Sequence, residues 1–122
     1  MTRWKSTTPA EQSESEYKAQ IIQYAQLNGW RVVSTPDGEH SRRIPSSMIG
    51  FPDLYLIRFR ADPDNGNEAT IAEHKYRELK AAKGRLSAAQ RIWGQHMLFA
   101  GLDYDVWRVG DTPWEVIEDD LR

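Results

Sequence analysis

Two stretches in the middle of the chain alternate apolar and polar residues, and a turn sequence separates them. Residues 54–59 and 70–79 both show the pattern typical of half-buried strands. Between them lies Asn65-Gly66, the strongest short hairpin signal, because both residues tolerate a positive φ. If these two residues form the turn, position 64 faces position 67 and every other cross-strand pair is fixed. The sequence therefore predicts an antiparallel hairpin with a defined register.

This register brings two carboxylates together. Asp53 precedes the first strand and Glu78 lies near the end of the second, and the predicted pairing makes them direct neighbours. Directly opposed Cβ atoms lie about 5 Å apart, so the two side chains share one face and can hold one Mg²⁺ at about 2.1 Å from oxygen ligands. Lys80 follows two residues later on the same face. Such a group can bind a divalent metal and position water beside a phosphodiester, which is nuclease chemistry. A β-bulge or a wider loop would shift the register.

A second acid-x-Lys pattern competes with the first. Glu73-His74-Lys75 has the same spacing as Glu78-Leu79-Lys80. In the predicted register Glu73 faces Arg58 in the middle of the strand, far from Asp53, and such a cross-strand ion pair contributes about 0.2–1 kcal/mol. We therefore assign the site to Glu78 and an ordinary ion pair to Glu73.

A helix is predicted before the first strand. Capping patterns at Thr8 and Ser13 offer two starts, and Asn28-Gly29 ends the helix. Its inward stripe consists of Tyr17, Ile21, Tyr24 and Ala25. Glu14 lies seven residues before Ile21, about 20° away around the axis, and so points along this stripe. It is either a first-turn acid favoured by the helix dipole or a third carboxylate aimed at the metal.

A second helix begins at the capping box Ser87-Ala88-Ala89-Gln90 and ends at Gly101. Its predicted apolar positions are Ala89, Ile92, Trp93, Met97 and Ala100. Gln90 has two readings. It either reaches back to the Ser87 backbone as the last residue of the capping box or, lying seven residues before Met97, aims its amide at the site.

The remaining segments complete the predicted fold. A short strand covers residues 30–34, another covers 104–109, and residues 112–115 cap a last helix that carries Trp114, Ile117 and Leu121. The order is α-β-β-β-α-β with a terminal helix, and the crossover helix makes the last two strands parallel. We expect one α/β domain spanning residues 1–122, with a mixed sheet flanked by helices.

The composition excludes or disfavours several classes of protein and site. The chain has no cysteine, which excludes disulfides and thiolate metal sites. No apolar run approaches the ~20 residues that span a bilayer, and no signal-peptide pattern is present, so we expect a soluble intracellular protein without a membrane partner. The net charge of −2 and pI near 5.9 argue against a protein that coats DNA. A basic run beside the predicted site supplies local positive charge: Lys75, Arg77, Lys80, Lys83 and Arg85.

Five ordered blocks resemble the VRR-NUC nucleases of the PD-(D/E)XK restriction-endonuclease-like superfamily. The blocks are Glu14 with the following helix and Gly29-Trp30, residues 50–54, Glu78-Leu79-Lys80, residues 83–87 with Gln90 and Trp93, and Gly101 with Val106-Trp107. The resemblance covers most of the chain and implies a restriction-endonuclease-like core. It departs from the family at Ser34, where many members place a histidine.

The resemblance implies a role for each matching residue. Asp53 and Glu78 would be metal ligands, the Leu79 backbone carbonyl a further ligand, and Lys80 the residue that orients or activates water. Glu14 would be the helix-borne acid and metal ligand of the site, and Gln90 its helical glutamine. The implied cofactor is Mg²⁺ or Mn²⁺.

Small stand-alone members are phage or bacterial enzymes that dimerise and cut branched DNA, including four-way junctions. We therefore expect a homodimer acting on branched or duplex DNA in the cytoplasm of a bacterial or phage-infected cell.

Some residues keep two interpretations. Arg42, Arg43, Lys83 and Arg85 are candidate contacts to the DNA backbone, or solvated surface charges. The loop 35–47 is the predicted segment for contact with DNA or a partner subunit. The five tryptophans and most other aromatic residues are assigned to the core rather than to base stacking, and the three histidines have no ligand-like spacing.

Two rival functions stay open. A nucleic-acid-binding module of the same fold would bind without cutting, and we would expect it to lack a metal ligand or the lysine. A metal-free structural protein would use Asp53 and Glu78 merely to cap strands, leaving two like charges side by side.

Overall fold

A computed structural model describes residues 12–35, 45–61, 64 and 70–122. Its elements, in order, are α1 (Glu14–Leu27), β1 (Arg31–Ser34), the 3-10 turn η3 (Ser46–Met48), β2 (Leu54–Ala61), β3 (Thr70–Lys80), α2 (Ala88–Phe99), β4 (Tyr104–Arg108) and α3 (Trp114–Leu121). The predicted order of helices and strands is confirmed. None of the helices in these ranges is long and apolar enough to cross a membrane.

The four strands form one mixed sheet in the order β1-β2-β3-β4. The pairs β1–β2 and β2–β3 are antiparallel, whereas β3 and β4 run parallel, as the crossover helix requires. The hairpin ladder runs from Leu54 opposite Arg77 to Ala61 opposite Thr70, which is the predicted register. Asn65-Gly66, the predicted turn, lies outside the described residues. Glu73 faces Arg58 and pairs with it at 2.8 Å, also as predicted.

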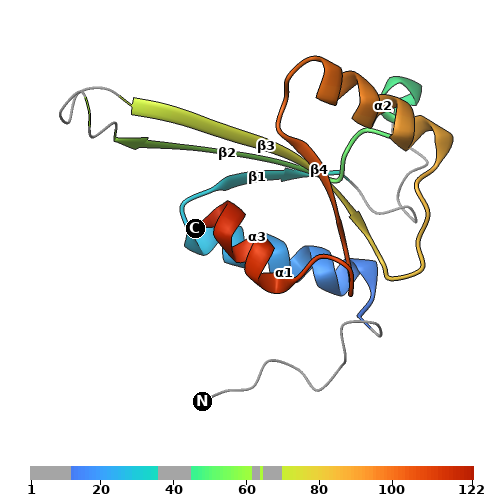
Figure 1. Ribbon diagram of the computed structural model, residues 1–122, viewed down its shortest axis with the longest axis horizontal. Coiled ribbons are helices and arrows are strands. Elements are labelled where there is room, and N and C mark those ends of the chain that lie inside the picture. Colours follow the sequence, from blue (N-terminus) through green and yellow to red (C-terminus); the bar gives the residue numbers. More distant parts are fainter. Residues whose placement is uncertain (1–11, 36–44, 62–63, 65–69) are drawn as a thin grey trace.

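Helices cover both faces of the sheet. Figure 1 shows α1 and α3 side by side below the sheet and α2 above it. Side chains alternate along a strand, so Leu54 and Leu79 point toward α1 and α3, whereas Asp53 and Glu78 point to the α2 side. The core on the α1 and α3 side consists of Tyr17, Ile21, Ala25, Trp30, Leu54, Leu56, Leu79, Trp107, Val109, Ile117 and Leu121.

The caps of two helices follow the sequence closely. The α1 helix begins at the second predicted cap, where the Ser13 hydroxyl accepts from the Glu16 N–H at 3.1 Å and the Glu16 carboxylate accepts from the Ser13 N–H at 3.2 Å. Asn28 is its C-cap, and Gly29 has a φ of +84°. The α2 helix has the predicted capping box at Ser87.

Two details of the helices were predicted wrongly. Ile92 is 54% exposed and Ala100 is also exposed, because α2 buries Gly94 together with Met97, of which only Met97 was predicted. A Cβ at Gly94 would come within 2.8 Å of the Tyr104 ring, so the missing side chain decides which side of α2 approaches β4. The N-cap of α3 is Pro113, and the Thr112 hydroxyl instead accepts a hydrogen bond from the Arg108 N–H at 2.9 Å.

Candidate functional site

The ends of β2 and β3 bring two carboxylates into contact. Asp53 lies one residue before β2, and Glu78 lies near the end of β3. Their side chains share a hydrogen bond, and the Oδ2 atom of Asp53 accepts a second one from the Leu79 N–H at 2.8 Å. The structure therefore places Asp53 and Glu78 together, one step beyond the ladder that fixes the hairpin register.

The segment before β2 fixes the position of Asp53. Gly50 has a φ of +87°, and a Cβ there would lie 2.5 Å from the backbone carbon of Ala89, so only glycine fits between this loop and α2. The Phe51 ring packs edge-on against Trp93 with centroids 5.1 Å apart, and the Trp93 indole N–H donates to the Ile49 carbonyl at 3.1 Å. The loop that carries Asp53 is thereby attached to the first turns of α2.

Glu78 is buried beside groups that oppose its ionisation. The residue is 2% exposed, and the pKa of its carboxyl is raised to about 9, chiefly by burial. The hydrogen bond to Asp53, the charge of Asp53 and the charge of Glu14 contribute to this rise, and Lys80 opposes it. The site therefore favours the protonated form of Glu78, in which its carboxyl donates to Asp53.

Lys80 lies beside this pair and is held by its surroundings. Its Nζ is 3.9 Å from the Oε2 atom of Glu78. A Cβ on Gly84 would lie 3.3 Å from the Lys80 Cδ, so the loop after β3 contacts the lysine stem. The Arg108 guanidinium holds that loop by donating to the carbonyls of Ala81 and Gly84. Sequence reasoning missed Arg108, because its contacts join segments that no local pattern links.

Gln90 fulfils both of its predicted roles at once. Its Oε1 atom accepts from the Ser87 N–H at 2.8 Å, which completes the capping box of α2. Its Nε2 atom donates to the Oε2 atom of Glu78 at 3.2 Å. One amide therefore caps the helix and orients the buried acid.

Two further residues, Glu14 and Tyr104, interact electrostatically with Glu78. Glu14 is exposed in the first turn of α1, and its charge contributes to the raised pKa of Glu78, so both readings of this residue are compatible with its position. Tyr104, at the start of β4, was not predicted near the site. The pKa of its phenol is raised to about 12, chiefly by burial and also by the charges of Glu78, Asp105 and Asp53.

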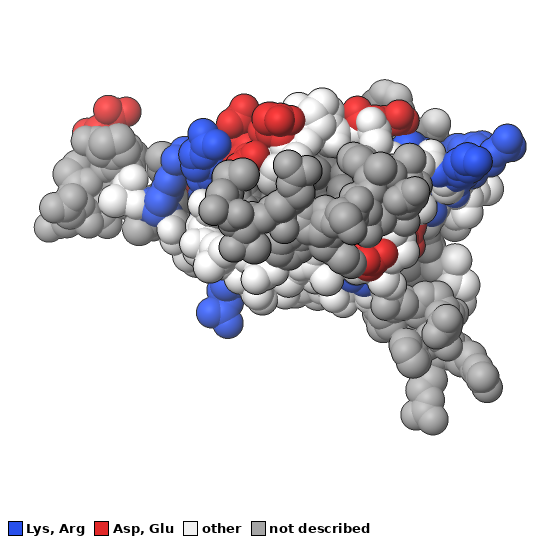
Figure 2. Space-filling model, turned by 90° about the horizontal axis from the view of Figure 1, so that it is seen from below, with Lys and Arg blue, Asp and Glu red and all other residues white. Residues whose placement is uncertain are grey.

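The predicted DNA contacts are only partly described. Lys83 and Arg85 are exposed in the connection between β3 and α2, whereas Arg42 and Arg43 lie outside the described residues. Figure 2 shows basic side chains gathered at the right-hand end of the molecule, the end at which Figure 1 places this connection. Positive charge is therefore present at the end of the molecule that carries Lys80.

The donor atoms at this site fit a hard divalent cation. Mg²⁺ and Mn²⁺ favour carboxylate and carbonyl oxygens, and Asp53 and Glu78 supply two carboxylates. The N–H and C=O of a strand residue point to the same edge, so the Leu79 carbonyl lies on the edge that faces Asp53. Within the described ranges, no three His, Cys, Asp or Glu side chains are grouped closely enough to hold a metal by themselves. Backbone carbonyl and water would have to complete the coordination.

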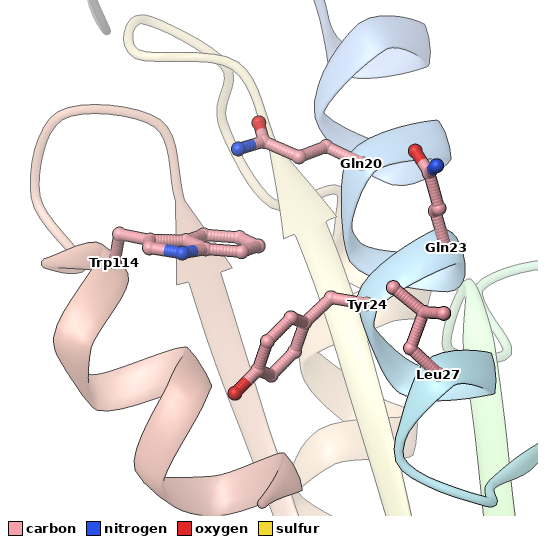
Figure 3. A pocket seen from close by; sticks show the side chains of 5 residues that line it. All are labelled: Gln20, Gln23, Tyr24, Leu27 and Trp114. Atoms are coloured by element: carbon pink, nitrogen blue, oxygen red, sulfur yellow. The ribbon is translucent and has the colours of Figure 1, made fainter. Parts of the chain in front are cut away.

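A hollow lies on the opposite side of the sheet from Asp53 and Glu78. Figure 3 shows it between α1 and α3, lined by Gln20, Gln23, Tyr24, Leu27 and Trp114. The Tyr24 and Trp114 rings meet edge-to-face with centroids 5.6 Å apart. The lining has no carboxylate, lysine or histidine, so it offers no counterpart to the chemistry at Glu78.

Comparison of the sequence and structure with protein-family models, curated proteins and solved structures finds no match.

Proposed function

We propose that this chain is a divalent-metal-dependent DNA endonuclease that hydrolyses phosphodiester bonds, with a restriction-endonuclease-like core of the VRR-NUC type. One observation carries the proposal: Asp53, Glu78 and Lys80 meet at the ends of two paired strands, and Gln90 binds the buried acid. Two acids and a lysine brought together from separate segments form a set that can bind a cation and act on a phosphate.

The residues of the site have two roles: some would bind the metal, and Lys80 would act on the attacking water and the phosphate. Asp53, Glu78 and the Leu79 carbonyl would hold Mg²⁺ or Mn²⁺, with Glu14 as a further acid. When bound, such an ion lowers the pKa of water and neutralises charge on the phosphate. Lys80 adds a cation fixed by the packing of its stem and stabilises negative charge on the attacking water and the phosphate. Together these effects must supply roughly 20 kcal/mol of barrier reduction.

Branched DNA, such as a four-way junction, is the proposed substrate. Symmetric cutting of two strands needs two active sites related by a two-fold axis, so we propose a homodimer. Lys83 and Arg85, with Arg42 and Arg43 outside the described residues, would contact the DNA backbone without reading its bases.

Cleavage of labelled duplex, nicked, flap and four-way-junction DNA in Mg²⁺ or Mn²⁺ tests the proposal. Asp53→Asn, Glu78→Gln and Lys80→Ala should each abolish cleavage while circular dichroism stays native. Glu73→Gln is the matched control, because Glu73 lies on the same strand in the same acid-x-Lys pattern and pairs with Arg58. Retained cleavage by Asp53→Asn would refute the mechanism.

The structure also gives a reason to test a metal-free structural role. This role was expected to leave two uncompensated charges side by side, but the raised pKa of Glu78 favours its protonated form, which removes one of them. Calorimetric titration with Mn²⁺ separates the two functions: a nuclease should bind the ion at Asp53 and Glu78, and a structural pair should not. Junction binding in EDTA and in Mg²⁺ separates binding from cutting.

A further inference from the structure

The α2 side of the sheet carries aromatic rings that extend away from the site. Side chains alternate along the strands, so Tyr55, Phe59, His74 and Tyr76 lie on the same face as Asp53 and Glu78. We call these four residues the aromatic face. Figure 1 shows β2 and β3 extending well past α2 toward their turn, so α2 covers only the end of this face near the site. Among the described helices, α1 and α3 lie on the other side.

The rings of Tyr55, His74 and Tyr76 lie against one another, and Phe59 lies farther along the same strip. Tyr55 and Tyr76 lie 4.9 Å apart by their centroids, and His74 lies 6.1 Å from Tyr76. Phe51, next to the site, reaches Tyr76 at 6.1 Å. Phe59 is 67% exposed, His74 is exposed, and the two tyrosines are half-buried. The assignment of most aromatic residues to the core is therefore wrong for Phe59.

The charges around the strip favour a negatively charged ligand. Arg31 of β1 pairs with Ile57 and so lies on this face. Among the described residues of β1, β2 and β3, the alternation places no carboxylate on this face other than Asp53 and Glu78. The acid in the middle of β3, Glu73, lies on the opposite face. A polyanion along the strip would thus meet a cation and no repelling acid until it reached the site.

We infer that the aromatic face binds a single-stranded segment of DNA through its bases and leads its backbone to Asp53 and Glu78. This inference rests on the proposed function. It specifies that the substrate is DNA with an unpaired arm. Rings bind bases of any sequence, because every base has a π-face. Same-face residues of a strand are about 6.7 Å apart, so Tyr76 is one step from Glu78 and two from Lys80. A strand stacked on Tyr76 would have its phosphates beside the two acids.

Fluorescence anisotropy in EDTA tests the inference, with a labelled oligothymidylate of about 20 nucleotides and a duplex of the same length as probes. Phe59→Ser and Tyr76→Leu should each weaken binding of the single strand by about 5-fold to 150-fold and affect the duplex much less. Tyr76→Phe keeps the ring and should bind as the wild type does. Phe99→Ser is the matched control, since Phe99 is 93% exposed on α2.

Two results would overturn the inference. One is unchanged binding of the single strand by both Phe59→Ser and Tyr76→Leu, with His74→Ala as a third variant should either fail to fold. The other is conversion of a dimer to a monomer by these variants in analytical ultracentrifugation, which would make the face a self-association surface. The proposed function is tested by a different experiment. It requires cleavage by the wild type in Mg²⁺ or Mn²⁺ and loss of cleavage in Asp53→Asn, and binding in EDTA measures neither.

Discussion

Glu78 gives the metal-free protein a characteristic dependence of stability on pH. Its pKa is about 9 in the folded protein against the ordinary value of 4.5, so between these values the folded state binds more protons than the unfolded state. The free energy of unfolding should then fall as pH rises from about 5 to about 9, with a slope of at most about 1.4 kcal/mol per pH unit. Urea unfolding in EDTA at several pH values measures this slope. Glu78→Gln removes the proton and should flatten the profile; identical slopes would contradict the account.

The amide of Gln90 should be needed for cleavage as well as for capping. In Gln90→Glu the carboxylate still accepts from the Ser87 N–H, but it also places a negative charge where an amide now donates to Glu78. We expect at least tenfold slower cleavage in this variant, because one lost or reversed charged hydrogen bond is worth about 1.5–3 kcal/mol. Initial rates on the preferred DNA measure the effect.

Ser87→Ala is the control for Gln90→Glu. It removes the cap without touching Glu78, and it should lower the free energy of unfolding by about 0.5–2 kcal/mol while cleavage stays near the wild-type rate. Equal loss of cleavage in the two variants would show that Gln90 acts only through the helix cap.

At the scale of single residues, the sequence predicted which acids meet but not what surrounds them. Register placed Asp53 beside Glu78, because pairing on a hairpin is a local property. The Arg108 contacts to Ala81 and Gly84, and the proximity of Tyr104, depend on how β4 docks beside β3. No periodicity in the sequence predicts how β4 docks beside β3.

Among the elements, the contact between the Gly50 loop and α2 should be the most sensitive to a small change. Gly50→Ala adds a Cβ 2.5 Å from the Ala89 backbone at a φ of +87°, so α2 must shift. We expect a loss of about 2–4 kcal/mol in the free energy of unfolding, from left-handed strain of about 1–2 kcal/mol plus overpacking of about 1–3 kcal/mol, and slower cleavage.

Gly101→Ala is the control for Gly50→Ala. Gly101 has a φ of +79°, but a Cβ there would meet nothing within 4 Å. Only the left-handed strain should remain, about 1–2 kcal/mol, with cleavage unchanged. Urea unfolding of both variants measures the difference, and equal losses would mean that the loop and α2 are not tightly packed.

Element boundaries followed from local chemistry, whereas the side that α2 buries did not. Ser13 and Ser87 cap their helices through side chains close in the sequence, so their patterns were sufficient. Apolar residues lie on several sides of α2, and the sequence favoured Ile92 over the side that carries Gly94. A glycine signals close approach only once its neighbour, here Tyr104, is known.

At the scale of the whole molecule, topology was predictable because few arrangements suit a hairpin followed by a crossover helix. The alternation along β2 and β3 decided which side chains share a face, and the crossover made β4 parallel to β3. The placement of α1 and α3 together, with α2 alone on the other side, could not be read from the chain. That placement leaves the aromatic face open beside the site.

The central claim is that oxygen atoms of Asp53 and Glu78 converge on one divalent cation. Anomalous diffraction from crystals soaked in Mn²⁺ measures this most directly, because the ion itself is located. We predict an anomalous peak between the two carboxylates, within about 2.3 Å of an oxygen of each, and no peak in crystals of Asp53→Asn. Wild-type crystals that show no peak between Asp53 and Glu78 would contradict the account.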